Sequence, residues 1–159
     1  MSVSANNSAK ISALVLAGSR PGPDPLLDGT GVSSKALLPI AGLPMLAHGL
    51  RALRASPEIG TITILAQDTA ALAAEPTIAS VENICFETSG QGISHSLAAA
   101  LSQRGEPVLV TTADHVLLTP QMVAEFVAGA RGHDVAVGMV ERATLLARYP
   151  ESRRTWLKF

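Results

Sequence analysis

The sequence predicts an α/β protein, a three-layer α/β/α sandwich with a mostly parallel sheet. Short aliphatic runs alternate along the chain with segments whose apolar residues recur at helical spacing, an order typical of βαβ units. The apolar residues are mainly small and aliphatic, since aromatic residues make up only 3% of the chain. Small aliphatic cores suit a buried parallel sheet that helices cover.

Five aliphatic runs are the predicted strands. Each is short and lies between turn signals or segments of helical spacing, as expected for buried strands. They are residues 13–16, 61–65, 84–86, 108–111 and 135–140.

Three apolar stripes between these runs predict helices. Pro44 precedes the first, and Thr119 with Pro120 provides an N-cap and an N1 proline for the third. Gly129 and Gly132 mark the expected end of the third helix. The stripes are Leu46, Leu50 and Leu53; Ile93, Leu97 and Leu101; and Met122, Val123, Phe126 and Val127.

The composition limits the class of protein. A chain of 159 residues with 47% hydrophobic residues can bury a sizeable single core, which excludes a disordered protein. We expect residues 1–10 to be a disordered lead-in and residues 11–159 to form one domain. No apolar run approaches the ~18 residues of a membrane span.

The net charge limits the expected binding partners, and the cysteine content indicates the expected location of the protein. The net charge of −1 predicts no broad surface for nucleic acid, although a single nucleotide needs only a few local donors. Cys85 is the single cysteine, so no internal disulfide forms. A cytoplasmic location is therefore expected.

The loop after the first predicted strand is a candidate phosphate site. It begins with Leu16-Ala17-Gly18-Ser19-Arg20 and runs through the Pro/Gly-rich residues 21–31 to Lys35. Gly18 allows a close backbone approach, successive N–H groups can bind an anion, and Arg20 and Lys35 add positive charge. Neither a Walker A motif nor a dinucleotide fingerprint is present. A flexible loop with solvated Arg20 and Lys35 remains the alternative.

Two further positions suggest ligand chemistry. Gly90 and Gly92 precede the helix that begins near Ile93, and Ser96 lies in its first turn, where N–H and hydroxyl groups can meet a phosphate or base. Asp114 follows the strand at residues 108–111, where a carboxylate can hold Mg²⁺. The alternatives are an ordinary glycine turn and a capping aspartate.

Taken together, these residues resemble the MobA-like nucleotidyltransferases, whose fold is Rossmann-like and nucleotide-diphospho-sugar transferase-like. The resemblance rests on three blocks in the family's order. The first is Leu16-Ala17-Gly18, Arg20, Lys35, Leu38-Pro39-Ile40 and Gly42-Leu43-Pro44-Met45-Leu46; the second is Gly90 with His95-Ser96-Leu97; the third is Asp114. The long loop at residues 19–34 departs from the compact family loop. Family members also continue beyond this point, so the domain is expected to be incomplete at its C-terminus.

The resemblance implies an enzyme that transfers a nucleoside monophosphate from CTP or GTP to a phosphorylated small-molecule acceptor and releases pyrophosphate. It implies Mg²⁺ as cofactor, with Asp114 as metal ligand and Arg20 and Lys35 as the other catalytic residues. The implied nucleotide-binding residues are Leu16, Ala17, Gly18, Ser19, Gly90, Gly92 and Ser96. The second hypothesis is a non-catalytic nucleotide-binding or subunit-interaction module derived from the same fold. The missing glycine triplet argues against a third, a dinucleotide-dependent oxidoreductase.

Overall fold

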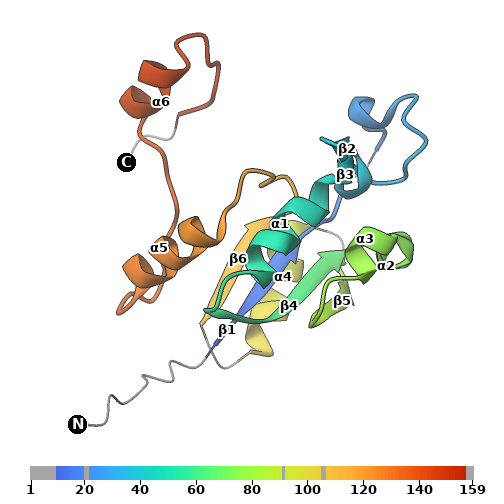
Figure 1. The fold of residues 1–159 in the computed structure, drawn as a ribbon, viewed down its shortest axis with the longest axis horizontal. Coiled ribbons are helices and arrows are strands. Elements are labelled where there is room, and N and C mark those ends of the chain that lie inside the picture. The colour runs from blue at the N-terminus through green and yellow to red at the C-terminus, as the bar shows by residue number, and fades with distance from the viewer. Residues whose placement is uncertain (1–9, 20–21, 91, 105–106, 157–159) are drawn as a thin grey trace.

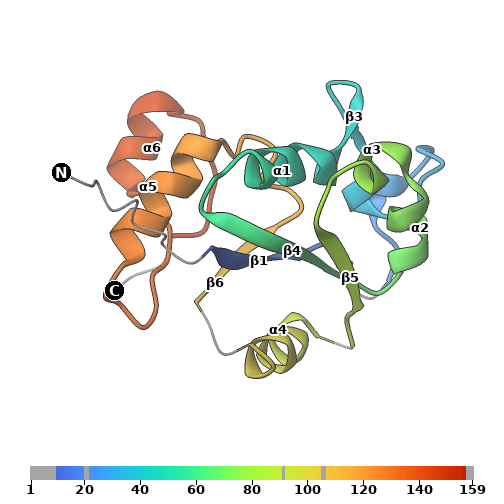
Figure 2. The ribbon, with the colours of Figure 1, turned by 60° about the horizontal axis from the view of Figure 1, so that its bottom comes forward.

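The computed structural model describes residues 10–19, 22–90, 92–104 and 107–156. At its centre is a four-stranded parallel sheet with the order β5-β4-β1-β6, and helices cover both of its faces (Figures 1 and 2). The three-layer α/β/α prediction is therefore confirmed. The sheet contains four of the five predicted strands: β1 (Ile11–Leu16), β4 (Ile59–Ala66), β5 (Ile84–Thr88) and β6 (Val108–Thr112).

The main hydrophobic core lies between the sheet and the first helical layer. Leu46, Leu50 and Leu53, the predicted stripe of the first helix, are fully buried there. They pack against Ala13 and Val15 of β1, which point to this side of the sheet. The helices that contribute to this core are α1 (Met45–Arg54), α2 (Thr69–Ala74), α3 (Pro76–Ala79) and α5 (Pro120–Ala130).

The second layer consists, within the described residues, of helix α4 (Ile93–Ser102), which lies below the sheet in Figure 2. Its contact with the sheet is small, because Ala100 is its only buried residue. Ala100 packs with Leu14 and Leu65, the residues that alternate onto this face of β1 and β4. Leu97 adds a partly buried contact.

Helix starts follow the predicted capping signals, and several short elements appear in addition. Thr119 accepts a hydrogen bond from the Met122 N–H at 3.2 Å, and Pro120 is the first residue of α5. Helix α5 ends at Ala130, between the two glycines that predicted its end. The elements that the sequence did not predict are α2, α3, α6 (Arg142–Arg148), the hairpin of β2 (Pro39–Ile40) and β3 (Leu43–Pro44), and the 3₁₀ turns η1 (Pro25–Leu27) and η2 (Lys35–Leu37).

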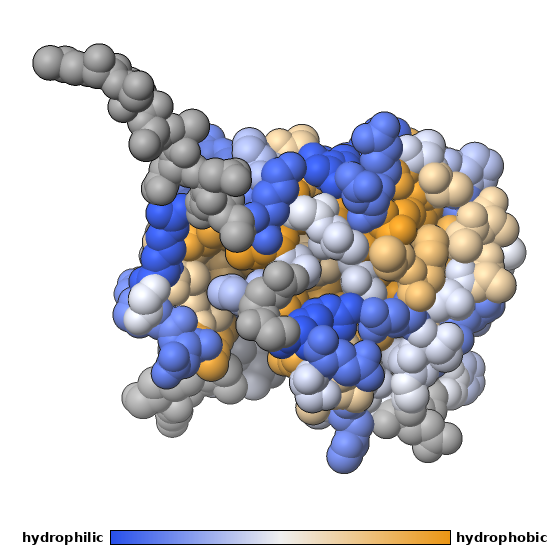
Figure 3. All heavy atoms as spheres, turned by 90° about the horizontal axis from the view of Figure 1, so that it is seen from below, coloured by the Kyte–Doolittle hydropathy of each residue, from blue (hydrophilic) through white to orange (hydrophobic). Residues whose placement is uncertain are grey.

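The prediction of a strand at residues 135–140 is wrong. This segment is irregular, and the side chains of Val135 and Val137 are 80% and 69% exposed. A strand needs a hydrogen-bonding neighbour, and none of the described strands pairs with this segment. Its apolar side chains remain on the surface. Figure 3 views the molecule from below Figure 1 and shows separate hydrophobic areas on that side. None of the described helices is both long enough and apolar enough to cross a bilayer.

The burial pattern predicts where truncation costs stability. Leu50→Ala should lower the free energy of unfolding by about 2–5 kcal/mol, because it leaves a cavity in the main core. Val137→Ala, a truncation at an exposed position, should change it by less than about 0.5 kcal/mol. Urea unfolding of both variants measures the difference. Equal losses would contradict the exposed position of residues 135–140.

Candidate active site

The loops that carry the predicted site residues begin at one edge of the sheet. Leu16 at the end of β1 lies opposite Leu65 of β4 and Thr112 of β6. Ala66 at the end of β4 lies opposite Thr88 of β5. All four strands thus end at the same level, and ligands of open α/β sheets bind beyond such carboxyl ends. The fold brings together three blocks that are far apart in the sequence.

Backbone hydrogen bonds set the direction of each loop where it leaves the sheet. The Ala17 N–H donates to the Leu65 carbonyl at 2.9 Å, and the Ser89 N–H donates to the Ala66 carbonyl at 2.8 Å. The Ala113 N–H donates to the Leu16 carbonyl at 3.0 Å. Each loop therefore begins with a residue tied to the neighbouring strand.

A cavity of about 700 Å³ lies between the loops, within the range of sites for small ligands. A second hollow of about 20 Å³, room for about one water, shares several of its lining residues and adds Leu16, Gly18 and Ser96. Lys35 and Asp114 line neither hollow. The larger cavity is lined by Ala17, Ser19, Ser33, Ser34, Ala66, Gln67, Asp68, Ser89, Gly90, Gly92 and Ile93.

Gln67 holds the first loop (residues 17–19) in place, a role that sequence reasoning missed. Its side-chain oxygen accepts from the Ser19 N–H at 2.9 Å, and its side-chain nitrogen donates to the Ser19 carbonyl at 3.1 Å. A Cβ on Gly18 would lie 2.9 Å from the Gln67 oxygen. Gln67 thus closes one side of the space beside Gly18, where the sequence predicts a close approach of a ligand. Gln67 and Asp68 directly follow β4, as Asp114 follows β6. This place after the end of a strand is the feature of the sequence that could have identified Gln67 as a site residue.

The glycine loop (Ser89, Gly90 and Gly92) leads into α4. Gly92 is the N-cap with φ of +94°, a conformation that favours glycine. The Ser96 hydroxyl donates to the Gly92 carbonyl at 3.0 Å and so holds the first turn. No side chain among the described residues caps this end of α4. Its first N–H groups and the positive end of the helix dipole are therefore available to an anion at the cavity.

Lys35 is held beside the site and already has an acidic partner. Ser34 caps η2 by accepting from the Ala36 N–H at 3.2 Å, and Ala36 is buried in the core. The Lys35 ammonium lies 2.7 Å from the Asp24 carboxylate, on the long loop that departs from the family pattern. Arg20, the other predicted cation, lies outside the described residues.

The ion pair changes the acidity of Asp24. The hydrogen bond from Lys35 is the main cause that lowers the pKa of the Asp24 carboxyl below its ordinary value of 3.8. Burial acts in the opposite direction, and the Leu26 N–H and the charge of Lys35 lower the pKa further. A carboxyl whose pKa is lowered in the folded state stabilises that state above its unfolded pKa. The pair is therefore fully formed at neutral pH and is lost only as the pH falls below about 3.8.

Asp114 lies at the end of β6 with an exposed carboxylate that accepts a hydrogen bond from the Thr112 hydroxyl. In the part of the chain that the structure describes, no three His, Cys, Asp or Glu side chains gather into a metal site. A single carboxylate fits Mg²⁺, which typically takes one or two carboxylates and completes its shell with waters and substrate phosphates. The neighbouring His115 ring is tied to its own turn by a 2.7 Å contact with the Thr111 hydroxyl.

Comparison with known sequences identifies one family. The family model of the MobA-like NTP transferase domain matches residues 13–153, which is most of the chain. No curated protein matches the sequence.

Three solved structures illustrate the fold that this chain shares. A hypothetical transferase from Thermus thermophilus is 27% identical, with a TM-score of 0.70 over 92% of this chain and 58% of its own. A 4-diphosphocytidyl-2C-methyl-D-erythritol synthase from Anaerococcus prevotii is 13% identical, with a TM-score of 0.59 over 84% of this chain and 60% of its own. A CMP-2-keto-3-deoxy-manno-octonic acid synthetase in complex with CTP is 15% identical, with a TM-score of 0.56 over 78% and 48%. The chain spans less than two thirds of each of these proteins.

The two hydrogen bonds by which Gln67 holds the first loop, here called the clamp, predict that removing them lowers the stability of the protein. Gln67→Met removes both hydrogen bonds to Ser19, which should cost about 1 kcal/mol and lower the melting temperature by about 2–4 °C. Gln103→Met, at the exposed end of α4, is the matched control and should leave the temperature unchanged. Thermal unfolding followed by circular dichroism compares the two. A melting temperature of Gln67→Met equal to wild type would contradict the clamp.

Proposed function

Because the chain belongs to the MobA-like NTP transferase domain family, we propose that it is a cytoplasmic, Mg²⁺-dependent nucleotidyltransferase. It transfers a nucleoside monophosphate from CTP or GTP to a phosphorylated small-molecule acceptor. The observation that carries this proposal is the cavity at the carboxyl edge of the sheet, which both predicted loops line. A nucleoside triphosphate is a ligand of suitable size for it.

Backbone groups and a few cations bind the triphosphate in this proposal. The N–H groups of the first loop and of the first turn of α4 face phosphate oxygens, and the dipole of α4 favours their negative charge. Lys35 and Arg20 add positive charge from the long loop. The base and sugar contact the glycine loop and Ser96.

The reaction is an in-line displacement at the α-phosphorus. A phosphate oxygen of the acceptor forms the new bond to this phosphorus, the bond to the β-phosphate oxygen breaks, and pyrophosphate leaves with the bonding electron pair. The residues of this chain position the two substrates and stabilise negative charge, and no side chain forms a covalent intermediate. Asp114 would hold Mg²⁺, which would supply positive charge to offset the charge of the triphosphate.

Thermal unfolding with each of ATP, GTP, CTP and UTP, with and without Mg²⁺, tests the proposal and identifies the donor. A nucleotide at 100 times its Kd should stabilise the folded state by about 2.7 kcal/mol. For a domain of this size the melting temperature should then rise by roughly 5–10 °C. Asp114→Asn should abolish the Mg²⁺-dependent part of this rise without lowering the melting temperature of the free protein.

Asp134→Asn is the control for Asp114→Asn, because it neutralises another exposed carboxylate in the loop after α5. It should keep the full nucleotide-dependent rise. If Asp114→Asn keeps the rise as well, Asp114 is not the metal ligand. If no nucleotide shifts the wild-type protein, the transferase proposal fails and the non-catalytic interaction module becomes the better account.

The ion pair of Lys35 predicts a gain in affinity. Asp24 competes with phosphate for the Lys35 ammonium, so Asp24→Asn should tighten triphosphate binding by about two- to fivefold, as expected for an exposed pair. The gain should shrink in 1 M salt, which screens exposed charges. Isothermal titration calorimetry at both salt concentrations measures it.

Asp28→Asn provides the matched control on the same loop, since no ion pair involves Asp28 in the described part of the chain. It removes the same charge without releasing Lys35 and should change the affinity less. Equal gains for the two variants would mean that net charge, and not release of Lys35, is responsible.

A further inference from the structure

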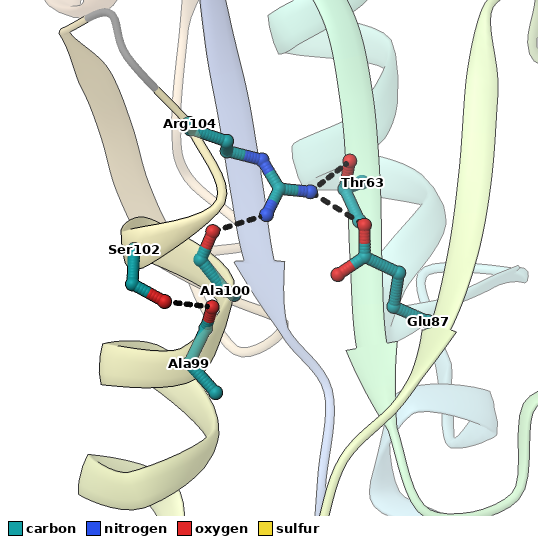
Figure 4. A network of polar contacts seen from close by, with 6 residues as sticks. All are labelled: Thr63, Glu87, Ala99, Ala100, Ser102 and Arg104. Atoms are coloured by element: carbon teal, nitrogen blue, oxygen red, sulfur yellow. Dashed lines mark hydrogen bonds and ion pairs between the residues drawn. The ribbon is translucent and has the colours of Figure 1, made fainter.

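Arg104 joins helix α4 to two strands of the sheet, and the cavity does not include it. Its guanidinium donates to the Ala100 carbonyl and to the Glu87 carboxylate, both at 2.5 Å, and to the Thr63 hydroxyl at 3.2 Å (Figure 4). These partners belong to α4, β5 and β4. One side chain thus connects three elements on the face of the sheet that α4 covers.

Each of the three partners of Arg104 requires a hydrogen-bond donor, for a different physical cause. Thr63 is a polar residue of β4, buried on the face of the sheet that α4 covers. Glu87 is a carboxylate on the same face as the apolar Leu65. The Ala100 carbonyl belongs to the last turn of α4, where carbonyls lack partners within the helix and a cation complements the dipole. The side chain of Arg104 is itself only 14% exposed, which strengthens these charged hydrogen bonds.

Apolar packing alone attaches α4 weakly. Leu46, Leu50 and Leu53 of α1 are all completely buried, whereas Ala100 is the only buried residue of α4. A helix held by a small apolar contact can shift or rotate on the sheet. Directional hydrogen bonds from a rigid guanidinium restrict such shifts, because the planar fork donates to its acceptors in one fixed geometry. Arg104 therefore adds directional restraint to the small apolar contact of α4 with the sheet.

The orientation of α4 determines the geometry of the glycine loop. This loop connects the end of β5 to the start of α4. Arg104 bonds Glu87 of β5 to Ala100 in the last turn of α4, so it fixes the far end of the same helix to the same strand. We propose that Arg104 is a positioning residue that holds the N-terminus of α4 and the glycine loop in the geometry that binds the triphosphate. The proposal rests on the proposed function, and Arg104 itself does not contact the nucleotide.

Hydrogen exchange of the nucleotide-free protein tests the positioning without requiring any ligand. Arg104→Met keeps the aliphatic stem but removes all three donors, and the amides of residues 92–97 should exchange roughly tenfold faster. The control is Arg54→Met, because Arg54 also bonds a helix to the sheet, donating from the end of α1 to the Gly60 carbonyl at 3.2 Å. It should leave the exchange of residues 92–97 unchanged.

Nucleotide titration of the same variants tests the consequence for binding. Arg104→Met should raise the Kd of the triphosphate that stabilises the wild type by about tenfold, which corresponds to about 1.4 kcal/mol, the size of one hydrogen bond's net contribution. Arg104→Lys, which keeps the charge, should recover part of the affinity, and Arg54→Met should bind as the wild type does. A merely stabilising role would lower the melting temperature of Arg104→Met without this change in Kd.

Two results separate this inference from the proposed function. If the wild type binds a triphosphate and Arg104→Met binds it within twofold, the positioning role is overturned while the transferase proposal stands. If the wild type binds none, the transferase proposal fails and the nucleotide-positioning role falls with it. The exchange data then show independently whether Arg104 holds the start of α4.

Discussion

The parallel pairing of β1 with β4 and β6 is the constraint on which the rest of the structure depends. Ala13, Leu14 and Val15 are at most 1% exposed, so β1 is buried on both faces and by strands on both sides. Pairing Leu16 with both Leu65 and Thr112 sets the strand ends level. A slip of one residue would turn the apolar side chains of β1 to the opposite faces and separate the loops that form the cavity.

Side chains at the edge of the cavity and beyond it brace each part of the candidate site. Gln67 forms hydrogen bonds with the first loop, and Ser34 caps the turn that carries Lys35. Arg104 attaches α4, the helix that follows the glycine loop, to the sheet. Such bracing matters for an anion site, because backbone N–H groups bind an anion well only when their directions are fixed before the anion arrives. The pairing of Lys35 with Asp24 has the opposite effect, since it occupies a cation that a phosphate would need.

The sheet and its long helices were predictable because their signals are local. Buried strands read as aliphatic runs, and Thr119 with Pro120 marks the start of α5 by its own chemistry. The segment at residues 135–140 shows the limit of this reasoning, because an apolar run becomes a strand only when another strand pairs with it. Helices α2 and α3 were missed because they are too short to show an apolar stripe, although Asp68 and Glu75 cap them.

The sequence by itself determined the α/β class, the four strands of the sheet, the helices α1, α4 and α5, and the three blocks that carry the resemblance to the family. It also determined that Gly18, Gly90 and Asp114 follow the ends of strands. Only the tertiary structure decided which side chains meet, because those contacts join distant positions. Gln67 reaches Ser19 across 48 residues, and Arg104 reaches Thr63 across 41. No local pattern encodes such pairs; they exist because the parallel sheet brings the ends and faces of its strands together.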